Sequence, residues 1–115
     1  MTPIYVIKEQ IYDAILIDDD ILMHQTWQLS ASAHGKKIKN FTHPSELISE
    51  HMMFSADTPV YIDSNLGNGL RGEIIAEDIY KSGFRNIYLT TGCEAHEFPP
   101  LPCLKGVVGK MPPWI

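Results

Sequence analysis

The chain has 115 residues, enough for one domain and too few for two, and 44% of them are hydrophobic, which excludes a disordered chain. The net charge of −5 argues against nucleic acid as a partner, because binding to phosphates needs a surplus of lysine and arginine. The sequence has no apolar run of about eighteen residues and no signal-peptide pattern, so we expect no membrane partner and a cytoplasmic domain with Cys93 and Cys103 reduced.

Five short apolar runs are expected to form strands. They lack the polar alternation of a half-exposed strand, which predicts strands buried on both faces of a parallel sheet. The run at 38–41 is the weakest, because Lys37 and Lys39 alternate with its apolar residues. The expected strands in chain order are 14–17, 38–41, 60–62, 87–89 and 107–108.

Three helices are expected between these strands. Asp20 is a suitable N-cap for a helix that runs to about Ala33, and Pro44 stands at a permitted first-turn position of a second helix. A third helix is predicted over 72–82. The alternation of strands and helices predicts an α/β fold, an open parallel five-stranded sheet with helices on both faces.

The C-terminal third departs from this alternation. Pro99, Pro100 and Pro102 forbid a long fourth helix, so at most a turn or two is expected between residues 92 and 97. The sequence ends at Ile115, shortly after the last strand, and we expect no fifth helix.

Polar side chains follow four of the expected strands. Asp18-Asp19-Asp20 follow the first, Asp63 the third, Thr90-Thr91 the fourth and Lys110 the fifth. Ligands of open parallel sheets bind at the carboxyl ends of the strands, so these side chains should share one edge. Clustered carboxylates suit Mg²⁺, an aspartate can accept a phosphoryl group, and a lysine with a hydroxyl can neutralise the phosphoryl oxygens.

Four segments in this order resemble the receiver domain of two-component response regulators. The resemblance covers about residues 13–112 of a single domain spanning 1–115, in which residues 1–12 are an N-terminal arm or an extra edge strand. It implies a flavodoxin-like fold with a degenerate fourth helix. The segments are Ile-Leu-Ile-Asp-Asp-Asp at 15–20, Tyr-Ile-Asp-Ser-Asn-Leu at 61–66, Leu-Thr-Thr-Gly at 89–92 and Val-Val-Gly-Lys at 107–110.

The resemblance also implies the roles of individual residues. Asp63 would be the phosphoacceptor, and Asp18, Asp19, Asp63 and the backbone carbonyl of Asn65 would hold Mg²⁺ as the cofactor.

The phosphoryl group would come from a sensor histidine kinase or a phosphotransfer domain. Thr91 would be the hydroxyl that follows this group, and Lys110 would pair with one of its oxygens. The only catalysis expected is self-phosphorylation and self-dephosphorylation at Asp63.

Three features depart from the family pattern. Met111 stands between Lys110 and Pro112, where the family usually has proline directly after the lysine. Val107 occupies a position that is usually aromatic, and the glycine-rich loop 64–72 is one residue longer than usual. The phosphorylation site therefore resembles the family more closely than the output region does.

Two other functions stay open. The chain could be a degenerate receiver that acts without phosphorylation, as a homodimer or with a neighbouring domain that covers an exposed sheet face. It could also be a Mg²⁺-dependent phosphohydrolase, although Leu22 stands where that class needs a hydroxyl or a valine.

Several residues have simpler interpretations. Thr90 competes with Thr91, and Lys105 competes with Lys110. Trp27 is expected to be a core residue, and the segment 99–102 is expected to stiffen a loop. The five histidines lack the spacing of a zinc site.

Overall fold

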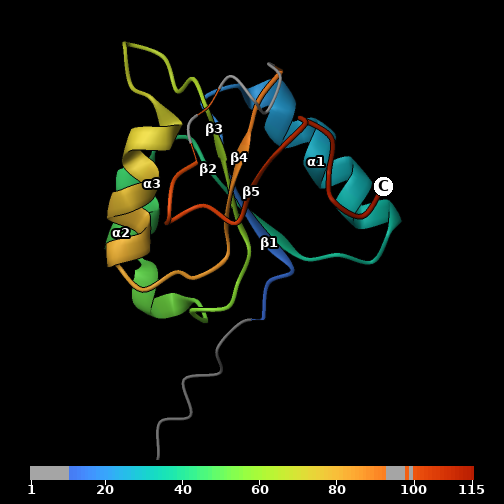
Figure 1. The fold of residues 1–115 in the computed structure, drawn as a ribbon. Coiled ribbons are helices and arrows are strands. Elements are labelled where there is room, and N and C mark those ends of the chain that lie inside the picture. The colour runs from blue at the N-terminus through green and yellow to red at the C-terminus, as the bar shows by residue number, and fades with distance from the viewer. Residues whose placement is uncertain (1–10, 93–97, 99) are drawn as a thin grey trace, which may run out of the picture.

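The computed structural model describes residues 11–92, 98 and 100–115. Five parallel strands form one sheet in the order β2-β1-β3-β4-β5 (Figure 1). This order is that of the flavodoxin-like fold, so the predicted fold class is confirmed. The strands are β1 (Ala14–Ile17), β2 (Ile38–Phe41), β3 (Val60–Asp63), β4 (Ile87–Thr90) and β5 (Gly106–Val108).

Helices cover both faces of the sheet. α1 (Ile21–Ala33) lies on one face, and α2 (Pro44–Ser49) and α3 (Gly72–Lys81) lie on the other, with a short 3-10 helix, η1 (His51–Met53), after α2 (Figure 1). The predicted N-cap of α1 is confirmed, because the side chain of Asp20 accepts a hydrogen bond from the backbone N–H of Leu22. Within the described ranges, no helix combines the length and the apolar character needed to cross a lipid bilayer.

Side chains that alternate along the strands build two cores. Ile15 and Ile17 of β1 point into the larger cluster under α2 and α3, which is mainly aliphatic but also contains three phenylalanines. Ala14 and Leu16, their neighbours on β1, point the other way into a more aromatic cluster under α1 that contains Trp27. The sheet is therefore buried on both faces in its middle, which explains the unbroken apolar runs of β1 and β3.

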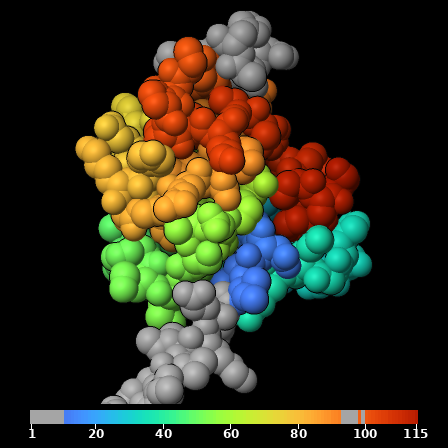
Figure 2. Space-filling view, turned by 60° about the horizontal axis from the view of Figure 1, so that its bottom comes forward, coloured from blue at the N-terminus to red at the C-terminus, as the bar shows by residue number. Residues whose placement is uncertain are grey.

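The segment after β5 takes the place of a helix on the α1 side. Residues 109–115 form bends and turns, so the prediction of no fifth helix holds for the described chain. This segment lies beside α1 (dark red in Figure 1 and Figure 2), where Trp114 packs against the cluster under α1. The predicted remnant of the fourth helix, Cys93, Pro99 and nearly all of the N-terminal arm lie outside the described residues.

Candidate functional site

Three carboxylates meet where β1 and β3 end. Asp18 directly follows β1, Asp63 is the last residue of β3, and Asp19 comes next to Asp18 in the chain. One oxygen from each of the three lies within 4.8 Å of the other two. Asp18 and Asp63 are buried, with 0% and 5% of their surface exposed, while Asp19 is exposed. The cluster could bind a metal ion between two buried ligands and one that faces solvent.

The register of the central strands explains this meeting. β1 and β3 are parallel neighbours, and Ile17 pairs with Ile62. Continuing the register by one residue brings Asp18 beside Asp63, on the same face of the sheet. The backbone hydrogen bonds of the sheet thus bring together two acids that are 45 positions apart in the sequence, although their negative charges repel each other.

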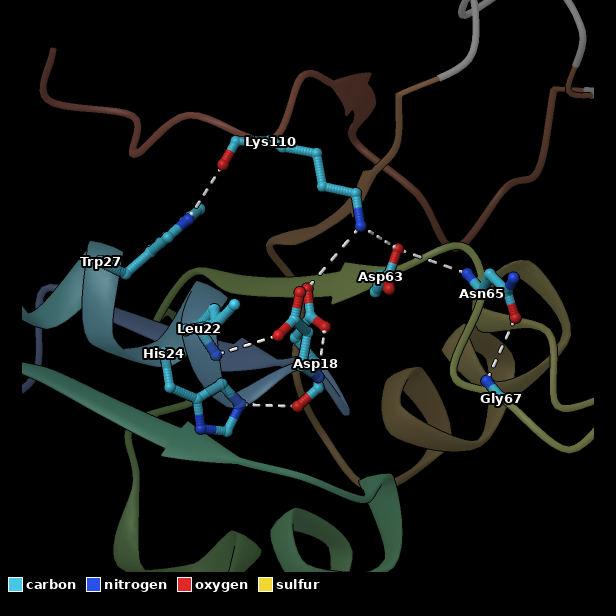
Figure 3. A network of polar contacts seen from close by, with 9 residues as sticks. Asp18, Leu22, His24, Trp27, Asp63, Asn65, Gly67 and Lys110 are labelled. Atoms are coloured by element: carbon cyan, nitrogen blue, oxygen red, sulfur yellow. Dashed lines mark hydrogen bonds and ion pairs between the residues drawn. The ribbon is translucent and has the colours of Figure 1, made fainter.

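Lys110 reaches the carboxylates from the segment after β5. Its Nζ lies 2.6 Å from Oδ1 of Asp63 and 3.8 Å from Oδ2 of Asp18 (Figure 3). The expected meeting of Asp18, Asp19, Asp63 and Lys110 at one edge is therefore observed. Lys105, the competing lysine, directly precedes β5 and so stands at the opposite end of that strand.

The carboxylates carry more negative charge than Lys110 balances. Burial is the largest cause that raises the pKa of Asp18 above its usual 3.8, and the negative charges of Asp63 and Asp19 raise it further. The backbone N–H of Asp20 and the ammonium of Lys110 act in the opposite direction. Oδ2 of Asp18 is buried and accepts no hydrogen bond. A buried, unsatisfied carboxylate oxygen beside two other carboxylates fits a hard divalent cation such as Mg²⁺.

The loop after β3 approaches the cluster closely. The backbone N–H of Asn65 donates to Oδ1 of Asp63, 3.3 Å away, and that of Gly67 donates to Oδ1 of Asn65, 3.1 Å away. Gly67 has a φ of 80°, and a Cβ there would come within 2.8 Å of Oδ2 of Asp19. A Cβ at Gly72 would overlap the backbone carbonyl oxygen of Asp63. These two glycines are needed for the loop to lie against the site, and the ligand role of the Asn65 carbonyl stays a prediction.

Thr90 ends β4 and Thr91 directly follows it. Thr90 pairs with Asp63 across the sheet, so its side chain is on the same face as that of Asp63. Its hydroxyl is buried without a hydrogen-bond partner. Thr91 is also buried, and its backbone N–H donates to the carbonyl of Val108 at 3.0 Å. The role of Thr91 stays a prediction, and the register places its competitor, Thr90, on the face of Asp63.

Two side chains of α1 donate hydrogen bonds to backbone carbonyls of site residues. Nε1 of Trp27 donates a hydrogen bond to the carbonyl oxygen of Lys110 at 3.0 Å, and Nε2 of His24 donates to that of Asp18 at 2.6 Å (Figure 3). The prediction of Trp27 as a core residue is confirmed by its 1% exposure. Most buried indole N–H groups have an acceptor, but the sequence gives no sign that the acceptor here is 83 positions away.

The remaining candidates lie elsewhere. Among the residues that the structure describes, no histidine joins a group with metal-ligand geometry, and His34 and His51 bond to nearby backbone carbonyls of their own helical segments. Cys103 is a free thiol, and burial is the largest cause that raises its pKa.

Comparison with protein-family models, with curated proteins and with solved structures found no match for this chain.

Proposed function

We propose that the chain is a phosphoacceptor receiver domain whose phosphorylated residue is Asp63. The observation that carries this proposal is the ammonium of Lys110 at 2.6 Å from Oδ1 of Asp63, beside two further carboxylates. An ammonium group next to one carboxylate of an acidic cluster can bind the oxygens of a phosphoryl group attached to that carboxylate. The resemblance of the four strand-end segments to receiver domains supports the same assignment.

The chemistry assigned to Asp63 is a nucleophilic substitution at phosphorus. One carboxylate oxygen forms a bond to phosphorus while the bond between phosphorus and the donor's imidazole nitrogen breaks, and the imidazole keeps the electron pair and takes up a proton. The ammonium of Lys110 balances the charge of the phosphoryl oxygens. A hydroxyl from Thr91 or Thr90 donates to one of these oxygens.

Mg²⁺ is the metal that we propose for the cluster. Asp18, Asp19, Asp63 and the backbone carbonyl of Asn65 would hold it. When bound, it supplies positive charge for the phosphoryl oxygens. The hard oxygen donors and the unsatisfied Oδ2 of Asp18 support this choice over softer metals.

The proposed partner is a sensor histidine kinase or a phosphotransfer domain in the cytoplasm. Phosphorylation would shift an equilibrium between two conformations, so that a different partner binds.

Intact-mass analysis tests the proposal. Wild-type protein incubated with Mg²⁺ and a small phosphodonor should gain the mass of one phosphoryl group, and Asp63→Asn should gain none. Asp57→Asn is a matched control, because Asp57 is exposed and precedes β3, at the end away from the cluster. An unmodified wild type, or equal modification of Asp63→Asn, contradicts the proposal.

A second candidate function is an interaction module that works without phosphorylation. It is favoured by a hollow of about 300 Å³ on the sheet face beside the C-terminal segment, lined by residues that include Tyr61, Tyr88, Val108 and Met111. Met111 is 63% exposed there. Sedimentation of the wild type and of Asp63→Asn, each without phosphodonor, tests this candidate. It is favoured if each protein forms a homodimer.

A further inference from the structure

Lys110 is held at both ends of the residue. Its ammonium contacts Asp63 and Asp18, and its backbone carbonyl accepts the hydrogen bond from Nε1 of Trp27 (Figure 3). The ammonium side is partly open, with 33% of the side chain exposed, whereas Trp27 is only 1% exposed. The backbone end of Lys110 is therefore the more deeply buried of the two contacts, and the group that holds it is an indole.

The chain around Lys110 is not part of a helix or a central strand. β5 is an edge strand of three residues, two of them half-buried and one exposed, and no helix follows it in the described chain. Pro112, two residues after Lys110, is buried, and the next side chain with a hydrogen bond is Trp114, whose Nε1 donates to Oγ of Ser30 at 2.9 Å. The rings of Trp27 and Trp114 meet edge to face, with centroids 5.7 Å apart. Two indoles thus attach the segment after β5 to α1.

The ring of Trp27 also packs against a residue of the sheet. Its centroid lies 5.4 Å from that of Tyr61, a residue of β3 that precedes Asp63 by two positions. Trp27 therefore touches the strand that carries the acid and bonds to the segment that carries the lysine. Trp27 thus contacts the chain segments of both residues that form the 2.6 Å ion pair.

We infer that Trp27 is a positioning residue, whose indole N–H fixes the Lys110 backbone so that the ammonium rests against Asp63. The consequence for phosphoryl transfer rests on the proposed function, whereas the effect on the Lys110–Asp63 contact does not. A lysine side chain is long and flexible, so a fixed backbone limits the volume that its ammonium can explore. Without the indole N–H, the carbonyl of Lys110 would bond to water and the segment would shift.

Residue-specific acylation of lysines tests the contact directly. Metal-free protein is treated briefly with an amine-reactive ester, and the labelling rate of each lysine is measured by mass spectrometry. Trp27→Phe keeps an aromatic ring but removes the N–H, and replacement of Trp27 by benzothienylalanine removes the N–H with nearly the same volume. Both changes should raise the labelling rate of Lys110 on the order of five-fold, the factor that one net hydrogen bond allows.

Two controls separate positioning from general loosening. Lys105 is exposed and lies at the other end of β5, so its labelling rate should not change. Trp114→Phe removes the bond to Ser30 but leaves the indole of Trp27, so it should raise labelling of Lys110 less than Trp27→Phe does. Unchanged labelling of Lys110 in both Trp27 variants, or an equal rise at Lys105, overturns the inference.

A double-mutant cycle tests the consequence for phosphorylation. Trp27→Phe should slow uptake of the phosphoryl group several-fold in the wild-type background and have no further effect in Lys110→Met. Equal slowing in both backgrounds overturns a role through Lys110. A wild type that takes up no phosphoryl group contradicts the proposed function, while the labelling experiment still decides the positioning of Lys110.

Discussion

The two sides of the candidate site differ in what holds them. The carboxylates Asp18 and Asp63 stand at the ends of β1 and β3, which are central strands whose residues are all buried. Lys110 stands after β5, a short edge strand, in a segment attached to α1 by the hydrogen bonds of Trp27 and Trp114. Backbone ladders fix the acids, whereas side-chain contacts fix the lysine. Damage to the central strands should therefore lower the stability of the whole fold strongly, and damage at the C-terminal segment should lower it less while displacing the lysine.

The largest effect is expected from the acid side. Ile62→Ala removes a fully buried side chain next to Asp63 and should lower the free energy of unfolding by about 2–5 kcal/mol. Denaturant unfolding measures the change. Leu22→Ala is the control, because Leu22 is 70% exposed and its loss should change stability by less than about 0.5 kcal/mol. Similar losses for the two variants would show that the buried side chain of Ile62 in β3 contributes no more to stability than an exposed one.

A smaller loss is expected at the loop that lies against Asp63. Gly72→Ala places a Cβ against the backbone carbonyl of Asp63, so either the loop or the strand end must move. We expect a loss of about 1–3 kcal/mol in the free energy of unfolding, as for other overpacked sites. Gly109→Ala is the matched control, since a Cβ at Gly109 meets no atom within 4 Å. A Gly72→Ala protein as stable as Gly109→Ala contradicts the close approach.

The metal effect comes next. Mg²⁺ at ten times its dissociation constant should raise the free energy of unfolding of the wild type by about 1.4 kcal/mol, because only the folded chain brings the three acids together. The gain should be absent in Asp18→Asn and retained in Asp57→Asn. Thermal melts with and without Mg²⁺ measure it, and melts that do not move for the wild type refute the metal site.

The same Asp18→Asn variant tests the raised pKa of Asp18. The folded protein keeps a proton on Asp18 at pH values where the unfolded chain has lost it, so the contribution of Asp18 to stability is complete below about 3.8 and falls as pH rises through the higher, folded-state pKa. The stability of Asp18→Asn relative to wild type, without metal, should therefore grow with pH from 3.8 upward and then level off. Unfolding curves across this pH range measure the difference, and a constant difference contradicts the shift.

The smallest effect is expected on the lysine side. Trp114→Phe removes one hydrogen bond, to Oγ of Ser30, and should cost about 1 kcal/mol of unfolding free energy. Ser30→Ala should cost a similar amount, and the double variant should cost little more than either, because both changes remove the same bond. Additive losses would show that the two side chains act separately.

The local patterns of this sequence were sufficient for the fold and for part of the site. Unbroken apolar runs predicted the buried parallel strands, and Asp20 predicted the start of α1. Because the carboxyl ends of parallel strands share one edge, the acids after β1 and β3 and the lysine after β5 could be expected to meet, and they do. These features depend on periodicity and strand direction, which neighbouring residues determine.

Only the tertiary structure decided which side chains support the site. The register of β4 against β3 puts Thr90 on the face of Asp63, and a shift of one residue would put Thr91 there instead. The bond from Trp27 to Lys110 joins positions 83 apart, through the packing of α1 on a segment that has no regular secondary structure. Contacts between distant segments depend on how side chains pack between helices and strands, and no local pattern in the sequence specifies that packing.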